Sequence, residues 1–221
     1  MAYIRCIGAN GGGGTTPSIT FTPKTFFDEQ GIGSSGWVAT DGTTNMSIQG
    51  TFASVTGEKV ISNSTNELRM YFPVTGSYYL FGIRCKVDPN FTPRNTNNWY
   101  ECSCIIGQEL GGTQKDCAVI IDKNGYFALG TDTATVNSTT VNALDGNEHT
   151  IFMLVNAGDI SLYIDGVLEK KVSITMNGGE MNNLGVFFNV ADGWTRTDGE
   201  IYSVGYWQEN TPILPYQFPT I

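Results

Sequence analysis

Short strand-like runs separated by turn residues recur along most of this chain, and this spacing limits the folds open to it. We expect strands at residues 19–26, 36–40, 46–54, 58–62, 67–74, 78–88, 99–107, 117–121, 126–130, 149–156, 159–165, 168–174, 184–190 and 199–207. Turn-favouring residues such as Gly, Asn, Asp and Ser bound these runs. No stretch shows a sustained apolar repeat of 3.6 residues, so almost no helix is expected. Many close strands without helices predict an antiparallel β-sandwich or barrel.

Local detail in the runs supports this prediction. The dipeptides Asn124-Gly125 and Asp165-Gly166 favour the positive φ values of tight hairpins. The run 159–165, which ends at the second of these dipeptides, alternates strictly with a period of two residues. Its apolar members are Ile160, Leu162 and Ile164, and Ser161, Tyr163 and Asp165 stand between and after them. A period of two places one face of this strand toward a core.

The two ends of the chain differ from the middle. Residues 1–18 form a short apolar segment followed by a Gly-rich linker, and residues 19–221 are expected to form one domain. Tyr3, Ile4 and Ile7 precede the glycine run, so we expect them to dock for attachment or oligomerisation, in cis or in trans. Three prolines in residues 209–221 exclude a central strand, and this tail is expected to cover a sheet edge.

Charge excludes several partners. The net charge is −9 and the isoelectric point is near 4.5, which repels phosphate backbones. The twelve Lys and Arg residues form no basic stripe, so no nucleic acid is expected. No apolar run approaches the roughly 18 residues that span a bilayer, so no membrane insertion is expected. The N-terminus lacks the pattern of a secretory signal, and we expect synthesis in the cytoplasm.

The five cysteines indicate neither a disulfide framework nor a zinc site. Their number is odd, and the pair Cys102 and Cys104 has C-x-C spacing with one histidine in the whole chain. In a strand this spacing places both thiols on one face. We therefore expect reduced cysteines in the core.

Four ordered segments resemble the C-terminal half of laminin G-like, concanavalin A-like domains. Residues 145–154 begin Asp-Gly-Asn-Glu-His and are similar to the "d-G-x-W-H-x-v" strand, with Glu148 in the place of the tryptophan. Residues 158–166 contain Leu-Tyr-Ile-Asp-Gly and are similar to the "l-x-L-Y-v-D-G" hairpin. Residues 183–188 and 198–207 are similar to the "l-x-i-G" strand and to the closing strand. The first hundred residues share only the strand content.

This resemblance implies an all-β fold, an antiparallel β-sandwich of the concanavalin A-like jelly-roll type. Members of the superfamily have two sheets, one of them concave, and bind glycans or proteins through the concave face or through loops at one rim. Some bind calcium, and a minority are glycoside hydrolases.

No pattern of catalytic residues accompanies the resemblance. Glycosidases need two carboxylates roughly 5–10 Å apart, and hydrolases of this fold that resemble bacterial glucanases carry them on an E-x-D-x-E or E-x-D-x-x-E strand, which is absent here. The nearest string, Asp198-Gly199-Glu200, fits the solvated start of a strand. His149 fits the alternation of its own strand, and no G-x-S-x-G elbow is present. We therefore expect no enzyme activity and no catalytic residue.

Two loops combine aromatic rings with polar partners, as glycan sites do. The first holds Arg94, Asn97, Trp99 and Tyr100, and the second holds Asp192, Trp194 and Arg196. Sugar rings stack on aromatic faces and their hydroxyls bond to amide, carboxylate and guanidinium groups. In the structural alternative, Trp99 and Tyr100 merely open a strand and Trp194 plugs the end of the sandwich. No cofactor is required, although residues 88–98 and 189–198 are rich in the oxygen ligands of calcium.

The preferred hypothesis is a non-enzymatic recognition or adhesion protein with a lectin-like jelly roll. Its expected partners are a glycan or cell-surface receptor, virion proteins and other copies of itself. A cytoplasm-made jelly roll with a docking segment favours a phage virion, as a decoration or receptor-binding accessory. A purely structural capsid or tail subunit and a glycoside hydrolase of the same fold are the alternatives.

Overall fold

The fold is described from a computed structural model, in which strands are assigned from Ser47 to Glu209. The structure describes residues 47–49, 54–55, 60–62, 68–72, 77–98, 102–109, 117–131, 135–174, 183–188, 197–218 and 221. Tyr3, Ile4, Ile7 and the expected strands at 19–26 and 36–40 lie outside these residues.

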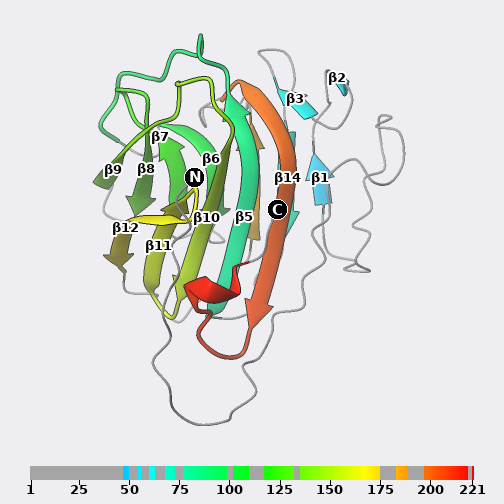
Figure 1. The fold of residues 1–221 in the computed structure, drawn as a ribbon, viewed down its shortest axis with the longest axis vertical. Helices are drawn as coiled ribbons and strands as arrows, with labels where there is room; N and C mark the ends of the chain where they lie inside the picture. Colours follow the sequence, from blue (N-terminus) through cyan, green and yellow to red (C-terminus); the bar gives the residue numbers. More distant parts are fainter. Residues whose placement is uncertain are drawn as a thin grey trace.

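The described chain forms two antiparallel seven-stranded sheets, shown in Figure 1. The front sheet in that view contains, in spatial order, β12 (Val167–Ser173), β11 (Asp159–Ile164), β10 (His149–Asn156), β5 (Tyr78–Val87), β14 (Gly199–Glu209), β3 (Val60–Ser62) and β2 (Ser54–Val55). The rear sheet contains β1 (Ser47–Gln49), β4 (Leu68–Phe72), β13 (Asn183–Phe188), β6 (Ser103–Glu109), β7 (Ala118–Ile121), β8 (Tyr126–Thr131) and β9 (Thr135–Asn142). The expected antiparallel β-sandwich is confirmed.

The hydrophobic core lies between the two sheets. Alternate residues of β5, including Phe81 and Ile83, meet Val119 of β7 and Phe127 of β8 in one buried cluster. These side chains are fully buried. The period-two pattern of the sequence therefore supplies the inner faces of both sheets.

The expected hairpins form with left-handed backbone at their turns. Ala157 and Gly158 connect β10 to β11 with φ values of 50° and 99°, and Asp165 and Gly166 connect β11 to β12 with φ values of 50° and 81°. Two consecutive positive φ values match the two-residue turns that fit the twist of paired strands. Between these turns, the inner face of β11 is as expected, with Ile160, Leu162 and Ile164 in the core.

The other face of the front sheet is also apolar and buried, because the C-terminal segment covers it. Leu80 and Phe152 form a second cluster with Ile213 and Ile221. The 3₁₀ turn Pro215–Gln217 (η2) crosses in front of the lower ends of β10 and β5 (Figure 1). The prediction that this tail covers a sheet edge is wrong. It covers the face of the central strands, where outward-facing apolar residues leave surface to bury.

Strand β9 is not among the strands expected from the sequence. The segment TVNSTTVN is polar and shows no apolar alternation, and it forms eight residues of strand at the end of the rear sheet. Only Thr139 in it is buried. An edge strand with little burial lacks the pattern by which strands are recognised.

The four described cysteines are free and buried, as expected. Cys102 and Cys104 share a small cluster on the outer side of the rear sheet, so the C-x-C pair does lie on one face. Within the described residues there is no α-helix, and hence no helix long and apolar enough to cross a membrane.

Candidate functional site

Several connections meet at one end of the sandwich. Cys85 pairs with His149 and Val87 pairs with Gly199, so β5 ends where β10 and β14 begin. The connection after β5 and the loop before β10 therefore lie at the same end, which is the upper end in Figure 1. We call residues 88–98 and 143–148 the loop rim.

Asp88 secures the first loop of the rim. Its backbone N–H donates to the carbonyl of Asp198 at 2.9 Å, which ties the loop to the start of β14. Its carboxylate accepts hydrogen bonds from the backbone and the side chain of Asn90, at 2.8 and 3.2 Å. Phe91 packs against the core beneath the loop. The loop is thus held by local hydrogen bonds and by one apolar anchor.

The middle of this loop presents polar side chains to solvent. The Thr96 N–H donates to the carbonyl of Arg94 at 3.0 Å, and the Asn98 N–H donates to the Thr96 hydroxyl at 3.1 Å. Arg94, Asn95 and Asn97 are exposed. The backbone turns satisfy main-chain groups, which leaves guanidinium and amide groups for a ligand.

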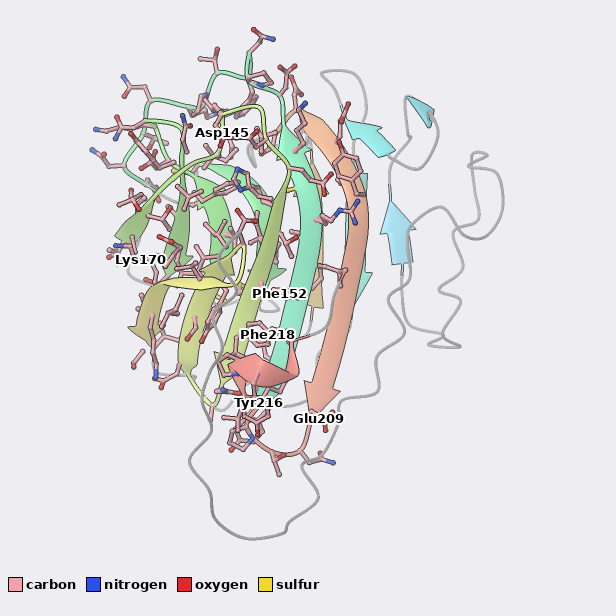
Figure 2. All side chains as sticks on the ribbon, in the orientation of Figure 1. Asp145, Phe152, Lys170, Glu209, Tyr216 and Phe218 are labelled. Atoms are coloured by element: carbon pink, nitrogen blue, oxygen red, sulfur yellow. The ribbon has the colours of Figure 1, made fainter. Side chains whose placement is uncertain are left out.

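The second loop of the rim has a similar turn. The Asp145 carboxylate accepts from the backbone and the side chain of Asn147, both at 2.8 Å. Gly146 has a φ of 78°, and a Cβ placed on it would lie 3.9 Å from Cγ of Pro89. The two loops of the rim are therefore neighbours, and Figure 2 shows polar side chains gathered around Asp145.

His149 connects the rim to the next hairpin. Its Nδ1 lies 2.7 Å from Oδ2 of Asp165 and its Nε2 lies 3.2 Å from Oδ1 of Asp145. The residue is buried, and its ring packs edge-on against Phe127 with a centroid distance of 5.3 Å. The imidazole thus bridges the β9–β10 loop and the β11–β12 turn.

The pKa values at this bridge shift in the directions that an ion pair produces. The hydrogen bond that His149 donates to the Asp165 carboxylate raises the pKa of His149, against the opposing effect of burial. Burial acts to raise the pKa of Asp165, but the hydrogen bonds from His149 and Thr150 outweigh it and lower that pKa. For Asp145, burial is likewise outweighed by hydrogen bonds from Asn147 and His149. An imidazolium between two carboxylates is the state that this geometry favours.

Only some of the expected ligand-binding residues can be placed. Arg94 and Asn97 lie exposed on the loop rim, as a binding role requires. Trp99, Tyr100, Asp192, Trp194 and Arg196 lie outside the described residues, and their roles stay predictions.

The flanks of the two expected binding loops do converge. Strand β6 begins at Ser103, just after the first loop, and Val186 of β13 pairs with Ile106 of β6. The hydroxyl of Thr197, just after the second loop, donates to the carbonyl of Cys104 at 3.1 Å. The described residues that flank the two loops therefore lie beside one another at the start of β6.

The bridge through His149 was not predicted as part of a site. The sequence places Asp145 four residues before His149, which is a weak signal. Asp165 reaches His149 only because β11 folds back on β10, pairing Ile164 with Ile151. The positions of Asp145, His149 and Asp165 in the sequence therefore do not predict that these three side chains meet.

In the described part of the chain, the groups that could serve in catalysis or metal binding take part in other contacts or are buried. Glu200 accepts a hydrogen bond from the Tyr202 hydroxyl at 2.6 Å. Burial raises the pKa of the Cys85 and Cys104 thiols, which disfavours the thiolate. No group of three His, Cys, Asp or Glu side chains within the described ranges is placed to hold a metal ion. The expected calcium ligands in 189–196 lie outside those ranges.

Comparison with known proteins shows similarity in structure alone. No protein-family model and no curated protein matches the sequence. The exoplasmic/lumenal domain of VIP36, solved with Ca²⁺ and mannose, superposes with a TM-score of 0.51 at 12% identity, over 86% of this chain and 90% of that one. The fold is concanavalin A-like.

Two further solved structures superpose on this fold. Trypanosoma rangeli sialidase in complex with sialic acid gives a TM-score of 0.60 at 14% identity and covers 77% of this chain. The chain spans 28% of that sialidase. Domain 4 of AbnA, a GH43 extracellular arabinanase from Geobacillus stearothermophilus, was solved with arabinotriose and gives a TM-score of 0.52 at 13% identity, over 78% of this chain and 85% of that domain.

Proposed function

We propose that this protein is a non-enzymatic glycan-binding domain whose ligand sits on the loop rim. The observation that carries the proposal is the exposed set Arg94, Asn95 and Asn97, held on a hydrogen-bonded loop whose Pro89 is a neighbour of Gly146 in the second rim loop. Amide and guanidinium groups donate to sugar hydroxyls, and amide oxygens and carboxylates accept from them. The structural neighbours support this choice, since those named above were solved with sugars bound.

The acidic character of the chain favours uncharged sugars. At this end of the sandwich Glu148 pairs with Arg84, and Asp145 and Asp165 flank His149, so these three carboxylates have cationic partners. The whole chain nevertheless carries a net charge of −9. A carboxylated sugar would meet repulsion from this net charge. We therefore propose a neutral, hydroxyl-rich glycan as the ligand.

The absence of catalysis is part of the proposal. Both ring nitrogens of His149 face carboxylates and hold two loops together, which leaves the imidazole no free role as a base. Glu200 is engaged by Tyr202. These contacts support a binding role over hydrolysis. Incubating the full chain with neutral and sialylated oligosaccharides would overturn this part if either were cleaved at an enzymatic rate.

A glycan array with and without calcium tests binding, followed by calorimetry on the best neutral sugar. We expect Arg94→Ala to weaken binding about tenfold, the loss typical of one charge-assisted hydrogen bond. Lys170→Ala is the matched control, because it removes one positive charge from β12, away from the rim loops. Unchanged binding in Arg94→Ala, or equal weakening in Lys170→Ala, would contradict a site on the rim.

Attachment to a phage virion is the finer part of the proposal, and its support is in the sequence. Tyr3, Ile4 and Ile7 form an apolar segment before four glycines, a composition suited to a docking segment on a flexible tether. Mass spectrometry of purified particles would detect the chain if it is a decoration or receptor-binding accessory. A purely structural subunit would be present in particles and would bind no sugar on the array.

A further inference from the structure

One side wall of the sandwich combines an uncharged edge strand with exposed apolar side chains. Strand β9 pairs with β8 on one side and is the last strand of the rear sheet in the described part of the chain. Strand β12 is the last strand of the front sheet among the described residues and contacts β9. We define the β9 wall as β9 together with Tyr126, Val167 and Leu168.

The two edge strands of this wall are unequally protected. Strand β12 carries Glu169, Lys170 and Lys171, and the register of its pairing with β11 shifts between Leu162 and Tyr163. Charged side chains and irregular register are the usual devices that keep an edge strand from pairing further. Strand β9 has eight residues, none of them charged and none of them proline, and its pairing with β8 also shifts register, between Tyr126 and Ala128. It therefore shares the irregular register of β12 but lacks the charged side chains that β12 carries.

Exposed apolar side chains border the neutral strand. Tyr126 is 38% exposed and stands opposite Asn142 of β9 in the register. Val167 and Leu168, at the start of β12, are 47% and 50% exposed. Among the described residues, five large hydrophobic side chains are exposed, and three of them belong to the β9 wall. An edge bordered in this way can bury apolar surface when another strand is added.

We propose that the β9 wall is a homodimer interface, in which β9 of one copy pairs antiparallel with β9 of a second copy. In a dimer with two-fold symmetry, each surface patch faces the same patch of the other copy. On most of the surface of a chain with a net charge of −9, acidic groups would therefore face one another and repel. A strand with no charged residue avoids this repulsion. Main-chain hydrogen bonds would then join the two rear sheets.

The β-branched residues of β9 fit the same partner. Five of its eight residues are Thr or Val, the types that pair well across strands. An antiparallel self-pairing places Thr, Val, Asn and Ser against one another on both faces of the joined sheet. No other chain is needed to supply complementary charge.

Sedimentation over a range of protein concentrations tests the interface on the full chain. We expect the unmodified chain to dimerise and Thr140→Lys to raise the dissociation constant at least about tenfold, because a lysine on an edge opposes pairing. Thr140 is an exposed residue of β9. Thr211→Lys, at an exposed position of the C-terminal segment, is the matched control and should leave the dimer intact.

A second pair of variants probes the apolar border. Leu168→Glu should weaken the dimer, and Leu214→Glu, at a side chain 43% exposed on the C-terminal segment, should not. Circular dichroism of each variant verifies that it remains folded. A monomeric unmodified chain at every concentration would overturn the proposal. Equal dissociation constants for Thr140→Lys and Thr211→Lys would overturn it as well, and neither result depends on sugar binding.

Discussion

Oδ2 of Asp165 lies 2.7 Å from Nδ1 of His149, although the two residues are 16 positions apart in the chain. The contact joins the turn after β11 to the start of β10, and Asp145 approaches the other ring nitrogen. One imidazole thus contacts both the second rim loop and the β11–β12 turn.

Stability should fall as the pH rises above the ordinary histidine range. The pKa of His149 is raised from 6.5 in the folded chain, so its stabilising effect is complete below that value and is lost as the pH passes the raised pKa. The pKa values of Asp145 and Asp165 are lowered from 3.8, so their effect is lost as the pH falls through the lowered values. Unfolding in urea across this range should show highest stability between the two limits.

The single histidine makes this test direct. The chain contains one His, so one imidazole resonance in a proton NMR titration reports its pKa without assignment. His149→Gln should flatten the alkaline limb of the stability profile, since glutamine does not titrate. A folded-state pKa at or below 6.5 would contradict the bridge.

Gly82→Ala should destabilise the fold by about 1–3 kcal/mol, the cost of overpacking. A Cβ on Gly82 would lie 2.5 Å from Cε1 of Phe152 and 2.9 Å from Cδ1 of Ile221. Phe152 cannot retreat easily, because its ring packs against Phe218 with 5.0 Å between the ring centroids. Chemical denaturation measures the loss.

A control separates this clash from the loss of glycine as such. Gly166→Ala meets open space and carries only the cost of a φ of 81°, about 1 kcal/mol. Adding Phe152→Leu to Gly82→Ala should recover part of the loss, so that the two changes are not additive. Strict additivity would show that the ring of Phe152 is not the obstacle.

Asn156→Ala should loosen the C-terminal segment. The Asn156 side chain donates to the carbonyl of Ile213 at 2.9 Å and accepts from its N–H at 3.1 Å. Removing the amide leaves these main-chain groups without their partner, at a cost of about 1–3 kcal/mol. Limited proteolysis should then cleave near residues 209–218 sooner, and Asn210→Ala, at an exposed position, should change little.

Trp99→Ala and Trp194→Ala should weaken glycan binding without a large loss of stability. Both residues stand in loops that pair an aromatic ring with polar neighbours. Calorimetry and thermal unfolding of the two variants distinguish the roles, because a ligand-stacking ring is exposed in the free protein. Unfolding of both variants would assign these side chains to the core.

Sequence patterns predicted the strands whose inner face is buried. The expected runs 78–88, 149–156 and 159–165 match β5, β10 and β11 to within a residue. They were recognisable because alternate residues contact one core. The same reasoning missed β9, whose polar side chains mostly face solvent at an edge. Arg94 and Asn97 were predicted as ligand-binding residues from residue type; the structure places them exposed on the rim, and their role stays a prediction.

The hairpins and the all-β character could be predicted from the sequence, because a turn or an alternating face depends on neighbours within a few residues. The meeting of Asp145 and Asp165 at His149 and the covering of Phe152 by the tail depend on strand pairing across long separations. Such contacts are decided only when the two sheets close over a shared core, because no local preference specifies which distant residue arrives beside another.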